Sequence, residues 1–403
     1  MSQTVAIAAS PAHRPGHVLR LSVAQALAGA NSTVVYAAGT IVGHMLAPSP
    51  ILATLPVSVY VVGMALCTLP AGAIARRHGR RAAFLTGTAS GVLAGLIAAL
   101  AIVLGSFWLF CVGTCFGGAY GAIVLSYRFA AADSAPPERR ARALSAVMAG
   151  GVFAGVIGPQ LVTLTMTLWQ PFLFAATFLA QAAVAALSAL ILAGVRLPRP
   201  TAAERAGGRP LGTILRQPRF IVAMICGTVA YMLMNFLMTT APLAMRLCGI
   251  AQRDSNLGLQ WHVIAMYAPS FFTGRLIGRF GAPRMVAAGL ALFAAAGAVG
   301  LAGIDVAHFW LSLILLGLGW NFSWLGASAL VLDCHRPEER TRVQSFNDFV
   351  VFGMMALGSF SAGGLLLTWG WDTVIWVSFV PLMVAVAALA LRASSLAPVS
   401  VMR

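Results

Sequence analysis

Long apolar stretches alternate along the whole chain with short polar connections. Around twelve stretches of about 20 residues can be marked, and each is long enough to cross a bilayer as a helix. With short connections between them, these stretches use up the chain. The pattern therefore predicts an all-α membrane protein with about twelve transmembrane helices.

The second half of the chain repeats the first at an offset of about 200 residues. Residues 133–142 align with residues 333–342 and share Asp, Pro, Glu and two Arg at the same spacing. A second correspondence links Gly72, Arg77 and Gly79 to Gly274, Arg279 and Gly281. The repeat predicts two six-helix halves in the same orientation.

A stretch rich in Arg, Pro and Gly separates the repeats and is typical of a cytoplasmic linker. We therefore divide the chain into an N-terminal six-helix half at residues 1–195, a linker at 196–219 and a C-terminal half at 220–403. The candidate metal ligands lie in the C-terminal half.

Composition narrows the class of protein. Hydrophobic residues make up 60% of the chain, charged residues only 9%, and the mean hydropathy is +0.88. These values exclude an ordinary soluble protein. All 26 basic residues are Arg, so no phosphate-binding loop that requires Lys is present. No combination of nucleophile, base and acid stands out either, and we do not expect an enzyme.

The net charge of +16 indicates topology. Most Arg residues fall at the termini or in every second connection, which is the positive-inside pattern. We expect a multi-pass protein of the bacterial inner membrane, surrounded by the lipid bilayer, with both termini in the cytoplasm. Nucleic-acid binding is not expected.

Some charged residues near the predicted cytoplasmic loops are candidates for gating or ion pairing. They are Asp133, Asp333, Asp348, Arg76, Arg77 and Arg279. For Asp348, the pattern favours an ion pair with Arg275 or Arg279 over proton uptake. Trp320 and Trp324 either line a cavity or pack within the protein.

Soft potential ligands gather between residues 231 and 266. Met234 and Met238 are spaced i, i+4, as are His262 and Met266, so each pair shares one helix face. Thioether, thiolate and imidazole groups together suit Cu(I). Methionine is also a common core residue, whereas an imidazole near the middle of the membrane is by default a functional candidate.

Other residues extend this set. Met245, Cys226 and Cys248 continue the sulfur-bearing side of the same segment, and His44 and Met45 close the first helix where an ion from outside could arrive. The positions equivalent to the two ligand pairs in the first half are Val34, Ala38, Val62 and Leu66. The fold itself therefore does not require sulfur or imidazole there.

The loop at residues 72–81 is similar to the loop motif of the major facilitator superfamily, except that Arg76 stands where that motif has Asp. The two parallel six-helix repeats also resemble the halves of such transporters. The resemblance implies the major facilitator fold, with a substrate site near mid-membrane between the halves.

Within that superfamily, residues 260–274 together with Met234 and Met238 resemble the CcoA-like bacterial copper importers. Those proteins supply copper for assembly of cbb3-type cytochrome c oxidase. The resemblance implies that Met234, Met238, His262 and Met266 are copper ligands. It also implies that Cys226 and Cys248 take part as thiols.

We therefore expect a monomeric secondary transporter that imports copper by alternating access and delivers it to a cytoplasmic acceptor. Copper would be the transported substrate, and no cofactor would be bound permanently. Two alternatives remain open. One is an organic-solute carrier such as a riboflavin importer, and the other is a non-transporting copper receptor or oxidase assembly factor.

Overall fold

The computed structural model describes residues 15–49, 52–195, 197, 200–206 and 208–391. Within these ranges the regular elements are all helical. The N-terminal half contains α1 (Pro15–Leu46), α2 (Leu55–His78), α3 (Arg80–Val103), α4 (Phe107–Leu125), α5 (Tyr127–Asp133), η2 (Pro137–Arg139), α6 (Arg140–Ala149), α7 (Gly151–Thr165) and α8 (Ala175–Ala193). The linker contains α9 (Ala202–Ala206) and α10 (Leu211–Leu215). The C-terminal half contains α11 (Pro218–Leu247), α12 (Gln252–Tyr267), α13 (Ser270–Phe280), α14 (Ala282–Ala302), α15 (Val306–Leu332) and α16 (Arg340–Leu391).

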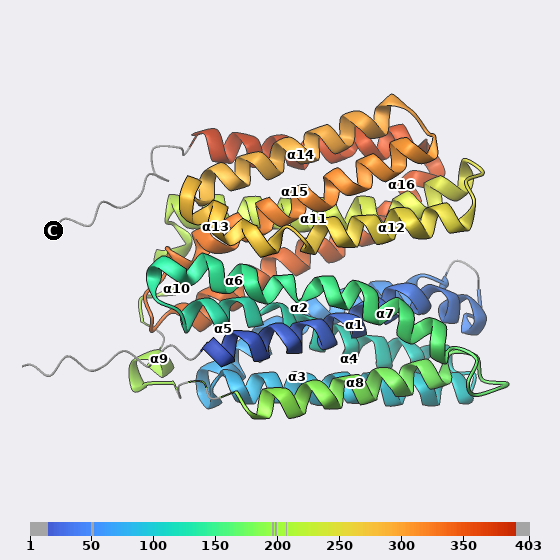
Figure 1. The fold of residues 1–403 in the computed structure, drawn as a ribbon, viewed down its shortest axis with the longest axis horizontal. Helices are drawn as coiled ribbons and strands as arrows, with labels where there is room; N and C mark the ends of the chain where they lie inside the picture. Colours follow the sequence, from blue (N-terminus) through green and yellow to red (C-terminus); the bar gives the residue numbers. More distant parts are fainter. Residues whose placement is uncertain (1–14, 50–51, 196, 198–199, 207, 392–403) are drawn as a thin grey trace, which may run out of the picture.

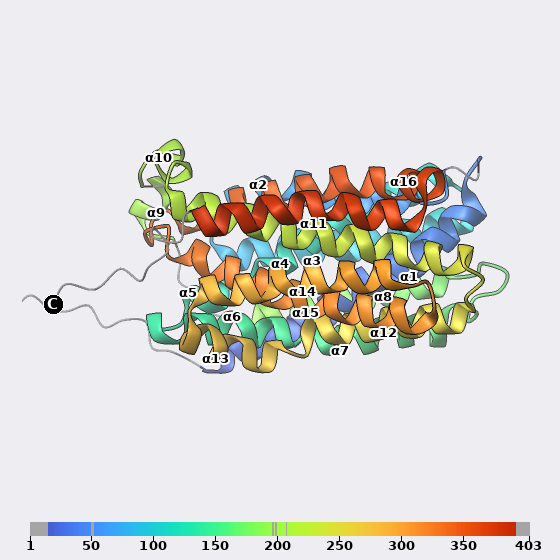
Figure 2. The same ribbon diagram turned by 90° about the horizontal axis from the view of Figure 1, so that it is seen from above.

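The long helices run side by side along the longest axis of the molecule (Figure 1 and Figure 2). Ten stretches of the described chain are long and apolar enough to span a membrane. The other two crossings come from α12 with α13, which are separated at residues 268–269, and from the first part of α16, which bends at Gly370. The prediction of an all-helical protein with two six-helix halves is confirmed.

Two equivalent turns show why the sequence repeats. Gly79 separates α2 from α3 with φ of 92°, and Gly281 separates α13 from α14 with φ of 85°. A side chain would strain this backbone conformation, so glycine is needed at both places. The repeated Gly therefore marks the same sharp turn in each half.

The two halves pack chiefly through four pairs of helices: α2 with α16, α6 with α13, α6 with α15, and α7 with α12. The largest hydrophobic core joins α2 to α11, α15 and α16. One end of the bundle bears α5, α6, α9, α10 and α13 together with most of the Arg-rich connections (Figure 1). We call it the arginine-rich end, and we call the other the opposite end.

Candidate functional site

Aromatic rings gather where the two halves meet. Tyr231 of α11 is central in the C-terminal half, with ring centroids 5.6 Å from Trp320, 4.9 Å from Trp324 and 5.6 Å from Phe352. The Tyr267 ring of α12 lies 5.5 Å from Trp320. These are edge-to-face contacts, the arrangement that aromatic quadrupoles favour.

Trp320 and Trp324 are spaced i, i+4 on α15, so their indoles stack along one helix face. Their centroids are 6.3 Å apart and their planes differ by only 17°. Both indoles are fully buried, yet among the described residues neither indole N–H has a hydrogen-bond acceptor. A buried N–H without an acceptor is costly, so these two indole groups call for an explanation.

The N-terminal half contributes Tyr36 of α1 and Tyr60 of α2, whose rings lie 5.6 Å apart. The Tyr60 hydroxyl donates a hydrogen bond of 2.7 Å to Ser32. Tyr60 and Tyr231 belong to one hydrophobic core, and Tyr36 and Tyr267 pack against it, so four helices from both halves bring tyrosines together. We call the seven residues the aromatic cluster: Tyr36, Tyr60, Tyr231, Tyr267, Trp320, Trp324 and Phe352.

Four of the six tyrosines in the chain belong to this cluster. Sequence reasoning considered Trp320 and Trp324 but missed the tyrosines and Phe352. The available signal was the rarity of tyrosine inside otherwise aliphatic segments, since a buried phenol normally needs a polar partner.

A buried ion pair lies beside the aromatic cluster and joins the halves. The Arg128 guanidinium of α5 is 2.8 Å from the Asp348 carboxylate of α16 and lies 4.4 Å from the ring of Trp324. Its Nε also donates to the Ser328 hydroxyl at 3.3 Å. The expected partner of Asp348 was wrong: the ion pair is with Arg128, whereas the Arg279 guanidinium lies over the Phe280 ring.

A second polar network joins the halves at the arginine-rich end. Arg80 donates to Asp133 at 2.5 Å and to the Gln344 side chain of α16 at 2.6 Å. Arg76 and Arg77 were the expected cations of this loop, but Arg80 makes the bond to Asp133. At the equivalent place in the second half, Asp333 pairs with Arg219 at 2.6 Å.

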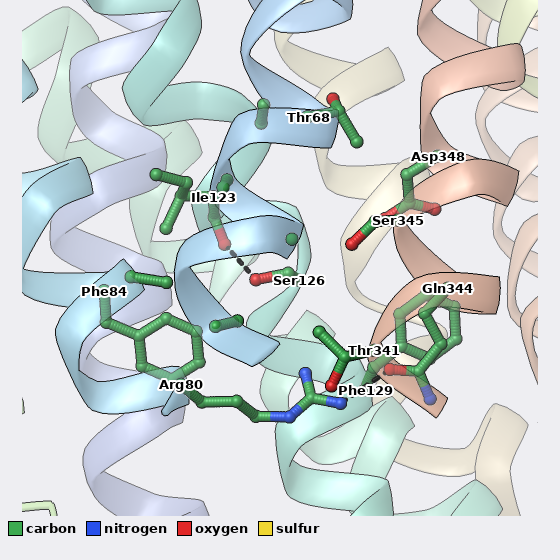
Figure 3. Close-up of a pocket in the computed structure, with 15 residues that line it drawn as sticks. Thr68, Arg80, Phe84, Ile123, Ser126, Phe129, Thr341, Gln344, Ser345 and Asp348 are labelled. Carbon is green, nitrogen blue, oxygen red and sulfur yellow. Dashed lines mark hydrogen bonds between the residues drawn. The ribbon is translucent and has the colours of Figure 1, made fainter. Parts of the chain in front are cut away.

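A small pocket connects the two networks, because Arg80, Gln344 and Asp348 all line it (Figure 3). Nearby, the Ser145 hydroxyl of α6 donates to the Ser270 carbonyl of α13 at 2.5 Å and accepts from the Gly274 N–H. These contacts hold the two halves together on the side of the arginine-rich end. The gating roles of the charged residues stay a prediction.

The candidate copper ligands lie in different environments, some in the hydrophobic core and others at the surface. Met234, Met245, Met266 and Cys226 are buried in the largest core, and Met238 is half-buried. The Cys226 thiol points toward the Ala385 carbonyl of α16, at 3.9 Å. Cys248 is exposed just after α11, while His44 and Met45 are exposed near the end of α1.

His262 packs toward α15, where its Nδ1 is 2.7 Å from the Leu313 carbonyl oxygen. Its Nε2 is buried and has no hydrogen-bond partner in the part of the chain that the structure describes. Among the residues that the structure describes, no group of three or more His, Cys, Asp and Glu side chains is arranged to hold a metal ion.

Two parallel six-helix halves that meet at a buried aromatic cluster, and are joined toward one end by an ion pair and hydrogen bonds, define a membrane transporter built from two repeated halves. The chain belongs to the Major Facilitator Superfamily, whose sequence pattern matches residues 21–268 and 256–400.

Similar proteins refine this class. The chain is 46% identical over 380 residues to the riboflavin transporter RfnT of Brucella anthropi, covering 93% of this chain and 95% of that protein. It is 31% identical over 353 residues to YddS of Bacillus subtilis, an uncharacterised transporter of the same superfamily, with 82% and 79% of the two chains covered.

Solved structures confirm the fold. The human organic anion transporter MFSD10 superposes with a TM-score of 0.74 at 16% identity, covering 93% of this chain and all of that one. The proton:xylose symporter XylE gives a TM-score of 0.74 at 14% identity, with 94% and 95% covered. At these identities the likeness concerns the fold alone.

The expectation of copper import is wrong. The similarity over nearly the whole chain is to a riboflavin transporter, and it supports the alternative of an organic-solute carrier. The physical reason for the error is that methionine pairs at helical spacing also arise from core packing, where Met234 and Met266 in fact lie.

Proposed function

We propose that the protein carries a flat aromatic organic solute across the bacterial inner membrane, with riboflavin as its substrate. The observation that supports this best is the aromatic cluster between the halves. The 46% identical relative named as a riboflavin transporter supports the choice of solute.

The chemistry of the cluster suits a flavin ring. Such a ring is planar and apolar on its faces, and each aromatic contact of suitable geometry contributes about 0.5–1.5 kcal/mol beyond area burial. The indole N–H groups of Trp320 and Trp324 lack acceptors, and a flavin offers carbonyl oxygens at the edge of its ring. A bound flavin would satisfy donors that the protein leaves unpaired.

The arrangement of charges suits alternating access. In this proposal the arginine-rich end faces the cytoplasm, as the positive-inside rule requires. The Arg128–Asp348 pair and the Arg80–Gln344 bond hold that end closed, so a solute would enter from the opposite end. Release would require both contacts to separate.

The test is uptake of labelled riboflavin by bacterial cells that lack their own importer. Cells with the intact protein should accumulate riboflavin, and Trp320→Ala and Trp324→Ala should each reduce initial uptake about tenfold or more, since each removes a stacking surface and an N–H donor.

Trp376→Ala is the matched control, because Trp376 is 63% exposed on α16 and lies outside the aromatic cluster. It should leave uptake unchanged at equal membrane levels. Background uptake by the intact protein, or equal uptake in all the Trp variants, would contradict the proposal.

A further inference from the structure

His262 is the one predicted ligand whose ring has a defined hydrogen bond and an unused nitrogen. The acceptor at Nδ1 is the Leu313 carbonyl, and a carbonyl oxygen can only accept. The proton of the neutral ring therefore lies on Nδ1. Nε2 is then a lone-pair acceptor.

Nothing in the described structure donates to this acceptor. The side chain is fully buried, and Nε2 is without a partner. A buried acceptor left unpaired costs about 1–3 kcal/mol, so a bound molecule that brings an O–H or N–H donor gains by meeting it.

The ring is held in place before any solute arrives. α12 and α15 approach so closely at Gly317 that a Cβ there would be 2.6 Å from the His262 carbonyl oxygen. With the helix backbone fixed by this contact and Nδ1 held by Leu313, Nε2 keeps one direction.

Helix geometry gives the distance from His262 to the aromatic cluster. Tyr267 is five residues further along α12, or about 7.5 Å along the axis, and Leu313 is seven residues from Trp320 on α15, or about 10 Å. Measured along the helix axes, His262 therefore lies about 8–10 Å beyond the cluster, toward the opposite end.

Riboflavin has matching parts: a flat ring and a flexible polyol side chain whose hydroxyls are donors. We propose that Nε2 of His262 accepts a hydrogen bond from a hydroxyl of this polyol chain while the ring lies on the aromatic cluster, so that His262 sets the preference for the polyol-bearing flavin. The inference rests on the proposed function and deepens it. The equivalent residue in the first half is Val62, so the histidine is not required by the fold.

The experiment compares riboflavin with lumiflavin, which has the same ring with a methyl group in place of the polyol. Each is titrated as a competitor of labelled riboflavin uptake. The intact protein should bind riboflavin about tenfold more tightly than lumiflavin, which is the effect of one well-placed hydrogen bond. His262→Leu should abolish this preference, because it weakens the binding of riboflavin and leaves the binding of lumiflavin unchanged.

His262→Gln keeps an acceptor and should retain part of the preference. An unchanged preference in His262→Leu overturns the inference while riboflavin transport itself stands. Equal binding of the two flavins by the intact protein overturns it as well, even if the Leu variant does not reach the membrane. Absence of riboflavin uptake by the intact protein overturns the proposed function, and the inference with it.

Discussion

The Arg128–Asp348 ion pair places two charged side chains in the protein interior, where charges are costly to bury. Both are buried, and they come from different halves of the chain. Burying charges in a low-dielectric interior costs several kcal/mol per ion, and only good geometry with further hydrogen bonds offsets that cost. The bond from Arg128 to Ser328 and the contact with the Trp324 ring supply such partners.

Asp348→Asn should therefore lower the free energy of unfolding by about 3–5 kcal/mol, because it leaves the Arg128 guanidinium buried without a counter-charge. The double variant Arg128→Met/Asp348→Leu should be less destabilised than the single one. Thermal or denaturant unfolding of the purified protein in detergent measures both.

Asp305→Asn is the control, since the Asp305 side chain is 85% exposed, and it should change stability by less than about 0.5 kcal/mol. An Asp348→Asn protein as stable as this control would show that the ion pair contributes little to the fold.

For individual residues, the sequence indicates which side chains need a partner but does not identify the partner. Asp348 was identifiable as an ion-pairing acid, because a carboxylate inside an apolar helix needs a cation. Its partner lies 220 positions away, and nothing local distinguishes Arg128 from Arg275 or Arg279. The tyrosines of the cluster are separated in the same way, since Tyr36 and Tyr267 pack against the same core only after both halves have folded.

Among the structural elements, the turns at Gly79 and Gly281 depend most directly on their sequence, because their positive φ angles require glycine. Gly281→Ala should lower stability by about 1 kcal/mol or more, because alanine is strained at a φ of 85°. Gly79→Ala should behave alike, as it occupies the equivalent turn.

Gly278 offers a control on the neighbouring helix α13: a Cβ added there meets nothing within 4 Å. Gly278→Ala should leave stability unchanged or raise it by up to about 1 kcal/mol, because alanine is the better helix former. The melting temperatures of the two variants measure this difference. Equal losses of stability in Gly278→Ala and Gly281→Ala would contradict the explanation that Gly281 is needed for its positive φ.

The positions of the helices were predictable, because an apolar stretch of about 20 residues has few alternatives to a membrane-spanning helix. The positions of the breaks within helices were not predictable. Proline is a usual cause of a helix break, yet α7 continues through Pro159, and the break between α6 and α7 falls at Gly150. A Cβ at Gly150 would lie 2.2 Å from the Ser22 carbonyl oxygen. The need for glycine arises there from a neighbouring helix, which a local pattern does not reveal.

Across the whole molecule, the linker is fastened to the C-terminal half. The Arg209 guanidinium donates to both carboxylate oxygens of Glu339, at 2.6 and 2.7 Å, and the Arg209 N–H donates to Oε1 at 3.0 Å. The hydrogen bonds from Arg209 lower the pKa of Glu339 from 4.5 to about 2.

This lowered pKa fixes the pH dependence of the contact. A carboxyl group with a depressed folded-state pKa contributes stability that is fully present above its unfolded value of 4.5 and is lost as pH falls toward about 2. Linker docking should therefore be constant between about pH 5 and pH 8.

Glu339→Gln should loosen the linker at neutral pH, since the charge-assisted contact is lost. Limited trypsin digestion, which cuts after Arg except where Pro follows, should then cleave the linker after Arg205 several-fold faster than in the intact protein. Glu138→Gln, at the equivalent exposed position of the first half, is the matched control and should leave the rate unchanged. Equal rates in both variants would show that Glu339 does not hold the linker.

The overall architecture was the most predictable level, because hydropathy, Arg distribution and the internal repeat all indicate the same two-half bundle. The transported solute was the least predictable. Soft side chains at helical spacing suggested a metal, whereas the rings that define the site come from α1, α2, α11, α12, α15 and α16 together. Such convergence depends on tertiary packing.

Cys248 lies just after α11 and is the exposed thiol among the six free cysteines, the others being buried or half-buried. It lies away from the arginine-rich end, so the proposed orientation places it outside the cell. The thiol of Cys248 therefore reports the orientation of the chain in the membrane. A membrane-impermeant maleimide should label the protein in intact cells, and Cys248→Ser should abolish this labelling. Labelling only after the cells are broken open would mean that the molecule sits in the membrane the other way up.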